Sequence, residues 1–479
     1  MFVFNRRVIL EERMKRPAGT IVLPKKEKRK AKVSPKTESN LIYQVDDKPG
    51  FILMTLLGFQ NILTAFGGIV AVPLVISGMA GFGVADTSYM ISAALLGSGV
   101  VSIIQSKGIG PKWFRVGAGL PTIMGTDFGF VGPANAVINT MGGGIAGYIG
   151  GTMMGSVLEI ILSYFIKPLM KFFPPVVTGT VISLMGLTLM PVAFDWVAGG
   201  VGAANYGSPL NLAIATVVFL LIVTLNHYGS VKIGPAAVLL GIVAGYIMCI
   251  PLGMVDFSQV AAANWFAMPQ LFKYGVSFDF KFAIPFISGY LVTVIETVGV
   301  MQTIGAVTET KLTDEDIANG VRADGVGSFI GPMMGSGPVA TFSQNAGLIP
   351  LTRNASRSVA IAAGVLLMAM SFLPKFATLV SIMPMAVLGG AGVLMFGNVA
   401  ASGVKSLSRV NFDNRNLIIV AAGLGIGLGV AFRPEVVAGL PGILGGLFSS
   451  GISAGTIVAL VLNIILKEKP AMETELENS

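Results

Sequence analysis

Long apolar runs, separated by short polar or glycine- and proline-rich breaks, recur along the chain after residue 50. Most are close to the ~20 residues that a helix needs to span the hydrocarbon core of a bilayer. The pattern therefore predicts an all-α polytopic membrane protein, and an even number of spans places both termini on one side. The fourteen predicted spans are 51–79, 87–107, 117–138, 144–166, 174–195, 208–228, 233–255, 281–306, 318–335, 338–352, 355–376, 378–401, 416–434 and 442–466.

Two of these segments do not look like continuous helices. Residues 117–133 and 335–350 contain polar side chains and several glycines, and each has two prolines twelve positions apart. Asp127 and Gln344 each lie six residues after the first of these prolines. Interrupted spans in corresponding places of two halves point to a transporter built from repeats, with a binding site near the midplane. Irregular backbone at membrane depth is tolerated only against protein or a water-filled cavity.

Composition excludes several soluble classes of protein. Hydrophobic residues make up 53% of the 479 residues and charged residues only 12%, against about 25% charged in soluble domains. Such a chain cannot cover itself with polar surface in water, which excludes a cytosolic enzyme, a nucleic-acid binder and a secreted disulfide scaffold. Cys249 and His227 are the only residues of their types, so we expect no internal disulfide, metal site or cofactor.

The net charge of +8 comes almost entirely from residues 1–49, which hold thirteen Lys or Arg and six Asp or Glu. Positive charge beside a first span marks the cytoplasmic side. We therefore predict a disordered cytoplasmic tail over 1–49, and a second polar tail over 468–479. Contact of the basic tail with anionic membrane lipids is an open alternative, whereas nucleic-acid binding is disfavoured because the basic run lacks interleaved aromatic residues.

A few polar residues interrupt otherwise apolar runs. A carboxylate near the bilayer centre costs at least about 2.5–3.5 kcal/mol, so such a residue is a functional candidate by default. Glu296 is the most isolated of them and is predicted to bind N–H donors and to carry a proton. Asp324 is either a proton relay or the partner of its neighbour Arg322 in a local ion pair, and Glu159 is expected at a helix interface.

The residues from Gln344-Asn345-Ala346-Gly347 to Thr352-Arg353 resemble the signature of the nucleobase–ascorbate transporter family, also called nucleobase–cation symporter 2. The resemblance extends over most of residues 50–466. It includes Thr126-Asp127-Phe128, Glu296, Ala323-Asp324-Gly325 and the amide pair Gln60-Asn61. The loop that begins at Asp195-Trp196 is most similar to the bacterial urate and xanthine permeases.

The resemblance implies fourteen spans in two inverted repeats of seven, here 50–256 and 280–467. Spans 1–4 and 8–11 would form a core that holds the substrate, and spans 5–7 and 12–14 a gate. Spans 3 and 10 would each contain a short strand followed by a half-helix. The resemblance also implies a homodimer in the plasma membrane of a bacterium, with both termini in the cytoplasm.

Site roles follow from the resemblance, position by position. The expected substrate-binding residues are Glu296, Gln344, Phe128, Ser343, Asp127 and Asn345. The coupling or supporting residues are Glu296, Asp324, Gln60 and Asn61, and the selectivity residues are Thr352 and Arg353. Two positions depart from the family pattern: Asn61 stands where histidine is common and cannot titrate near neutral pH, and Asp127 adds a carboxylate near the expected substrate.

Together these features predict a secondary active transporter that imports xanthine and/or urate with protons. A uracil or other nucleobase permease of the same fold is the first alternative. Relatives with Glu at the Gln344 position tend to take uracil, whereas Gln suggests xanthine or urate. An intramembrane enzyme is disfavoured because no nucleophile–base pair or metal-ligand set can be assembled, and a channel would lack saturable, proton-dependent flux.

Overall fold

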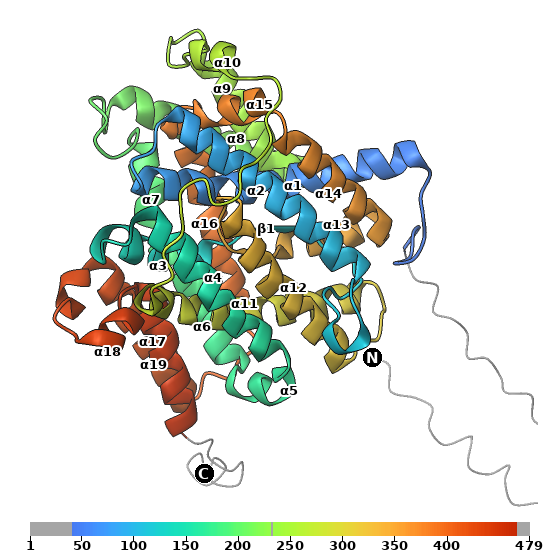
Figure 1. Ribbon diagram of the computed structural model, residues 1–479, viewed down its shortest axis with the longest axis vertical. Helices are drawn as coiled ribbons and strands as arrows, with labels where there is room; N and C mark the ends of the chain where they lie inside the picture. The colour runs from blue at the N-terminus through green and yellow to red at the C-terminus, as the bar shows by residue number, and fades with distance from the viewer. Residues whose placement is uncertain (1–40, 231–232, 467–479) are drawn as a thin grey trace, which may run out of the picture. The chain divides into compact units, whose positions relative to one another are not determined.

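The computed structural model describes residues 41–230 and 233–466, and it is mostly helical (Figure 1). The elements of the first half are α1 (Phe51–Met79), α2 (Val84–Lys107), η1 (Lys112–Phe114), β1 (Met124–Thr126), η2 (Phe128–Phe130), α3 (Val131–Asn135), the π-helical η3 (Ala136–Thr140), α4 (Gly144–Ser163), α5 (Ile166–Leu169), η4 (Met170–Phe172), α6 (Pro175–Thr188), α7 (Met190–Val197), α8 (Pro209–Tyr228), η5 (Gly234–Ala236), α9 (Ala237–Cys249) and α10 (Ser258–Ala262).

The second half also consists of long helices and one short strand. Its elements are α11 (Phe280–Val307), α12 (Asp314–Met333), β2 (Val339–Thr341), α13 (Ser343–Thr352), α14 (Arg357–Ser371), α15 (Pro374–Ser381), α16 (Met385–Leu407), α17 (Asn414–Phe432), η6 (Pro434–Val437), α18 (Gly442–Leu447) and α19 (Gly451–Ile465).

Eight helices in the described residues, with α6 and α7 counted together as one, are long and apolar enough to cross a membrane. The number rises to nine if α14 and α15, which meet at a bend of 84°, are counted as one broken span. The bend falls where Leu373 and Pro374 follow each other, and proline disfavours helical backbone in the residue before it. The next helix begins at Met385 and continues to Leu407, so the predicted span 378–401 starts and ends too early.

The helices pack as two groups. One consists of α1, α2, α4, α11, α12 and α14, and the other of α6, α7, α8, α9, α16, α17 and α19. Small residues permit close approach between helices in membranes, where apolar packing against lipid gives no preference. The pair α17 and α19, side by side in Figure 1, is an example: a Cβ at Gly451 on α19 would lie 2.3 Å from Gly427 O and 2.6 Å from Ala431 Cβ on α17.

β1 and β2 pair antiparallel inside the first group of helices, with Gly125 opposite Ala340. The hydrogen bonding continues beyond the strands, because Phe342 N donates to Ile123 O (3.0 Å) and Asp127 N donates to Pro338 O (3.1 Å). Both strands are fully buried. Since unpaired backbone groups are costly in a membrane interior, each interrupted segment supplies the partner that the other needs.

Residues 41–49 belong to the range predicted as a disordered tail, but they are ordered. Tyr43 forms a parallel bridge with Asn354, and Ser356 Oγ donates to Asp47 O at 2.5 Å. Arg357 also pairs with Asp46 at 2.6 Å. The rest of the predicted tail, 1–40, lies outside the described residues, as does the C-terminal tail.

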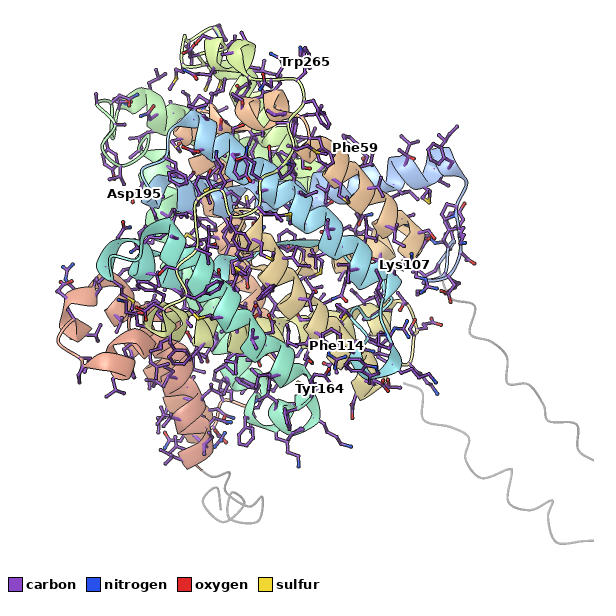
Figure 2. The ribbon with its side chains drawn as sticks, in the orientation of Figure 1. Phe59, Lys107, Phe114, Tyr164, Asp195 and Trp265 are labelled. Atoms are coloured by element: carbon purple, nitrogen blue, oxygen red, sulfur yellow. The ribbon has the colours of Figure 1, made fainter. Side chains whose placement is uncertain are left out.

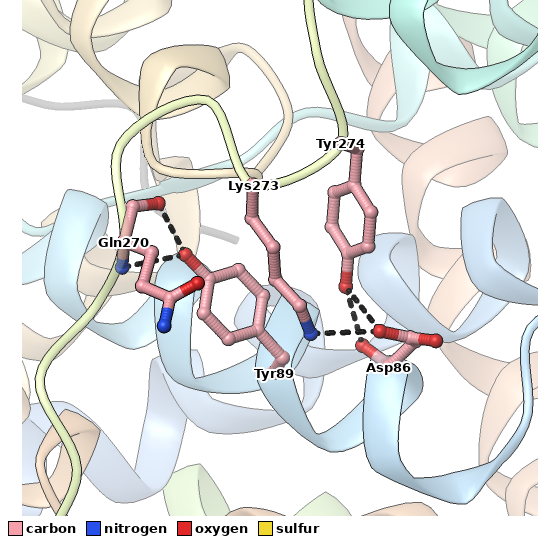
Figure 3. Close-up of polar contacts among 5 residues, drawn as sticks. All are labelled: Asp86, Tyr89, Gln270, Lys273 and Tyr274. Carbon is pink, nitrogen blue, oxygen red and sulfur yellow. Dashed lines mark hydrogen bonds and ion pairs between the residues drawn. The ribbon is translucent and has the colours of Figure 1, made fainter.

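The connection between α10 and α11 is fastened to the first turns of α2 (Figure 3). Tyr89 Oη donates to Gln270 O (2.5 Å) and accepts from Gln270 N (2.8 Å). Lys273 pairs with Asp86 at 2.7 Å and lies over the Tyr89 ring at 4.1 Å. Burial and the neighbouring Asp86 carboxylate raise the pKa of Tyr274 above its ordinary value, so its hydroxyl stays protonated and can donate to Asp86.

Candidate functional site

The second interrupted segment leaves a helix N-terminus open. β2 ends at Thr341, and α13 begins two residues later at Ser343 without a side-chain cap. Ser343 and Gln344 are both exposed. The first N–H groups of a helix have no partner within the helix, and such an end attracts polar or anionic groups. The start of α13 therefore offers backbone donors together with one hydroxyl and one amide.

In the first interrupted segment, a side chain of the segment itself caps the start of the helix. Asp127 follows β1, and its Oδ1 accepts a hydrogen bond from Gly129 N at 2.8 Å. The side chain is buried, and Oδ2 has no hydrogen-bond partner among the described residues. This geometry makes Asp127 a cap for its own helix.

Phe128, the next residue, lies against the second group of helices. Its ring centroid is 5.1 Å from that of Phe396 on α16, at an interplanar angle of 79°. Phe396 in turn lies 6.0 Å from Trp196 of α7. The aromatic cluster of Phe128, Phe396 and Trp196 is thus where the first interrupted segment meets α7 and α16. Aromatic faces of this kind support planar ligands as well as each other.

Glu296 lies on α11, the helix that contacts both interrupted segments through η2, β2 and α13. Its side chain is only partly buried. One turn further along α11, Gly299 is exposed, and a Cβ there would meet no atom within 4 Å. Glu296 is therefore a membrane-depth carboxylate beside open space, on the helix that lines the start of α13.

Asp324 is the centre of a buried polar cluster, which we call the carboxylate hub. Its Oδ1 accepts from Thr341 Oγ1 at 3.0 Å and from Gln105 Nε2 at 3.5 Å, and its Oδ2 accepts from Thr297 Oγ1. The hub joins α12 to β2, α2 and α11. Thr297 directly follows Glu296, so the helix that carries Glu296 also contributes a residue to the hub.

The ion pair considered for Asp324 does not form. The Arg322 guanidinium instead donates to Arg115 O (2.7 Å) and to Asn319 Oδ1 (2.9 Å), and it lies 4.1 Å from the Tyr164 ring centroid. Arg322 and Asp324 are two positions apart, and residues so spaced on a helix do not face each other.

The amide residues of α1 and α13 are brought together. Asn345 Nδ2 donates to the backbone O of Asn61 (3.0 Å) and to its Oδ1 (3.1 Å). Asn345 is buried, whereas its neighbour Gln344 is exposed. Asn345 therefore fixes α13 to α1, while Gln60 is partly buried on the same helix.

The two expected selectivity residues lie at the other end of α13. Thr352 Oγ1 donates to Leu348 O at 2.9 Å, and Arg353 ends the helix in a left-handed conformation with φ of 54°. The ten residues of α13 span about 15 Å at 1.5 Å per residue. Direct contact with a ligand at the start of α13 is thus not available to them, and any effect on selectivity must pass through the helix.

Comparison with known proteins identifies the family. A family model described as the Permease family matches residues 53–436. The chain belongs to this permease family. Like the other members, it is a multi-pass membrane transporter and not an enzyme.

Three relatives of this permease match over most of their length. A Clostridium perfringens protein provisionally named a purine permease is 52% identical, with 92% of this chain and 96% of the relative covered. The xanthine permease of Bacillus subtilis is 38% identical, with 87% and 94% covered. The uric acid transporter UacT of Escherichia coli is also 38% identical, with 87% and 86% covered.

Solved structures of other transporters share the fold. The transmembrane domain of a cyanobacterial bicarbonate transporter, BicA, gives a TM-score of 0.56 at 14% identity, with 83% of this chain and 100% of that chain covered. The murine anion transporter Slc26a9 in its inward-facing state gives 0.55 at 11% identity, with 88% and 69% covered. At these identities the likeness concerns the fold alone.

Sequence reasoning on this permease missed the partners of Asp324. Gln105, Thr297 and Thr341 are each fully or almost fully buried. A signal was available only for Gln105, an amide near the end of the predicted span 87–107. Among the described residues, no group of three or more His, Cys, Asp or Glu side chains is placed to hold a metal ion.

Proposed function

We propose that this permease imports oxidised purines, xanthine and/or urate, by proton symport across the plasma membrane. The observation that carries the proposal is the uncapped start of α13, where Ser343 and Gln344 are exposed, on a helix that contacts the helix of Glu296. Relatives named as a xanthine permease and a uric acid transporter support this substrate class.

The donor and acceptor groups suit a purine edge. An oxidised purine is flat and carries alternating N–H and C=O groups. Gln344 supplies one acceptor and two amide hydrogens, and an ionised Glu296 accepts from N–H groups. Phe128, at the boundary between the helix groups, offers an aromatic face. The proposed site would be supported by the amide residues of α1 and α13, namely Gln60, Asn61 and Asn345.

The proposed transport cycle moves the two helix groups relative to each other. The group with α1, α2, α4, α11, α12 and α14 would be the substrate-holding core, and the group with α6 to α9, α16, α17 and α19 the gate. In this view the interrupted segments, α12, α9 and α19 also cross the membrane. The chain would then have fourteen spans as two inverted repeats, cytoplasmic termini and a homodimeric state.

Coupling to protons is assigned to Glu296 with Asp324. A carboxyl group at membrane depth that binds substrate only in one protonation state links proton loading to substrate loading. The hydrogen bond from Thr297 to Asp324 connects the residue next to Glu296 to a second carboxyl group. Among the described residues, neither carboxyl group forms an ion pair with a basic side chain.

Uptake measurements test the proposal. Cells without their own purine permeases would express the full chain and receive radiolabelled xanthine, urate or uracil, with and without an uncoupler. We expect saturable accumulation of xanthine or urate that the uncoupler abolishes. Preference for uracil would favour the nucleobase alternative. Accumulation that persists without a proton gradient would refute proton symport, and non-saturable flux would indicate a channel.

A further inference from the structure

A polar stripe follows the buried face of α4. Thr152, Ser156, Glu159 and Ser163 recur every three or four residues, and all are fully buried, which places them on one side of the helix. The three hydroxyl groups donate to carbonyl oxygens of α4 itself. Glu159 differs, because neither of its carboxyl oxygens has a hydrogen-bond partner among the described residues.

The turn of α4 that carries Glu159 packs against the carboxylate hub. Gly325 follows Asp324, and a Cβ at Gly325 would lie 3.0 Å from Ile160 N and 3.3 Å from Ser156 O. The absence of a side chain at Gly325 thus lets α12 touch α4 beside Glu159. The backbone next to Asp324 therefore lies against the turn of α4 that carries Glu159.

Other titratable groups around Glu159 come from each neighbouring element. On α11, Tyr290 Oη donates to Thr152 O at 2.7 Å. On α12, Arg322 Nε donates to Ser163 Oγ at 3.2 Å, one turn beyond Glu159. A cation therefore marks one end of the stripe, and the segment that carries Asp324 packs against its middle.

A cavity of about 350 Å³ opens at the Arg322 end. Its lining includes Ser163, Arg322, Asn319 and Tyr164. In Figure 2, Phe114 and Tyr164 lie near this end, and Trp265 lies at the opposite end of the helices. The chain around this end carries Lys107, Lys112, Arg115, Lys167 and Lys171, and the cavity lining also includes Asp314 and Glu315. An excess of Lys and Arg indicates the cytoplasmic side.

We propose that Glu159 is a second proton-carrying carboxyl group, through which protons pass from Asp324 to the cytoplasmic cavity beside Ser163 and Arg322. This inference rests on the proposed proton symport. Glu159 first gives its proton to water in the cavity and becomes a carboxylate. Protonated Asp324 then transfers its proton to Glu159. Only O–H bonds break and form, and one proton moves in each cycle.

A purely structural role explains Glu159 poorly. A buried polar group without a hydrogen-bond partner costs about 1–3 kcal/mol, and an ionisable group at membrane depth costs at least about 2.5 kcal/mol. Neighbouring positions on the same face use small hydroxyl residues that α4 satisfies by itself. A carboxyl group kept at such a cost, between a second carboxyl group and a water-accessible cavity, fits a group that exchanges protons.

Proteoliposomes that contain a pH-sensitive dye separate proton release from substrate binding. Counterflow exchange of xanthine needs no net proton transfer, whereas net uptake does. For Glu159→Gln we expect counterflow within threefold of wild type, net uptake reduced at least tenfold, and loss of xanthine-driven acidification inside the vesicles. Glu159→Asp should recover at least a third of net uptake. Glu435→Gln, which neutralises an exposed carboxylate, should behave as wild type.

Each contrary result has a distinct meaning. If Glu159→Gln still acidifies the vesicles at the wild-type proton-to-xanthine ratio, the route through Glu159 is wrong and the symport stands. Equal loss of counterflow and net uptake, with a lowered thermal unfolding temperature and no recovery in Glu159→Asp, assigns Glu159 to packing and also overturns the route. If wild type takes up xanthine without acidification, proton symport itself fails, and the route fails with it.

Discussion

The two interrupted segments pair with each other through β1 and β2, but the helices that follow these strands begin in opposite ways. After β1, the Asp127 carboxylate accepts a hydrogen bond from Gly129 N and so closes the start of its own helix. After β2, no side chain caps α13, and Ser343 and Gln344 are exposed. One helix start is thus satisfied within the protein, and the other is left for a ligand.

The helical segments that follow the two strands also differ in their regularity. The first segment continues as a 3-10 turn, one short α-helix and a π-helical turn, and such departures from α-helix geometry often accompany functional sites. The second continues as a regular ten-residue helix that Asn345 ties to Asn61. We infer that the first segment contributes shape and an aromatic face, and the second contributes hydrogen-bond donors on a fixed axis.

The largest expected effect distinguishes the two carboxylates of the site. Asp127 is used by its own helix, so Glu296 is the acid that can respond to substrate and proton. Glu296→Gln should lower accumulation at least a hundredfold while the protein stays in the membrane. Uptake with and without an uncoupler, together with an immunoblot of the membrane fraction, would measure this. A variant that still concentrates purine would remove Glu296 from the coupling role.

The next prediction concerns disruption of the pairing between β1 and β2. A Cβ at Gly125 would overlap the ring of Phe342, which also covers Gly68. Gly125→Ala should therefore separate β1 from β2, lower the thermal unfolding temperature and reduce uptake at least tenfold. The matched control is Gly78→Ala, because Gly78 is exposed on α1 and a Cβ there would meet no atom within 4 Å. Equal stability of both variants would show that the pair of β1 and β2 tolerates a shift of the Phe342 ring.

A third prediction tests the open helix start. An ionised glutamate at position 344 presents acceptors only, whereas glutamine presents donor and acceptor. An unpaired buried polar group costs about 1–3 kcal/mol, so Gln344→Glu should weaken binding roughly 5- to 150-fold. The loss should be greater for urate, largely an anion at neutral pH, than for neutral uracil.

Competition by unlabelled bases against xanthine uptake measures that loss. Gln302→Glu is the control for added negative charge, because Gln302 is exposed further along α11. If urate competes equally well against wild type and Gln344→Glu, Gln344 does not face the ligand, and the site must lie elsewhere.

The sequence was sufficient to predict the broad fold, because spans are specified by apolar length and interrupted spans by glycine and proline. Register was not predictable in this way. The leading prolines of the two segments, Pro121 and Pro338, are 217 positions apart, and this spacing aligns Asp127 with Gln344. The strands instead pair antiparallel, with Gly125 opposite Ala340, so that Asp127 lies beside Pro338 and its N–H donates to Pro338 O. Only backbone hydrogen bonds distinguish these alignments.

The candidate site was predicted as a set of residue types but not as an arrangement. Gln344 and Asn345 are neighbours in sequence, yet one is exposed and the other is buried against α1. Thr352 and Arg353 belong to the same motif but lie a full helix away. Nothing in the sequence distinguishes Thr297 and Thr341, yet both donate hydrogen bonds to Asp324. Each of these distinctions depends on which helix face meets which neighbour, and that is set by tertiary packing.

The smallest expected effect concerns the closed helix start. Asparagine caps a helix about as well as aspartate, while alanine costs about 0.5–2 kcal/mol. Asp127→Asn should therefore leave the thermal unfolding temperature within about a degree of wild type, and Asp127→Ala should lower it measurably. Because the Asp127 carboxylate is turned toward Gly129, Asp127→Asn should change the half-saturating concentration of xanthine by less than threefold. Loss of transport in Asp127→Asn, comparable to that in Glu296→Gln, would mean that both interrupted segments present acids to the substrate, and the contrast between a closed and an open helix start would no longer hold.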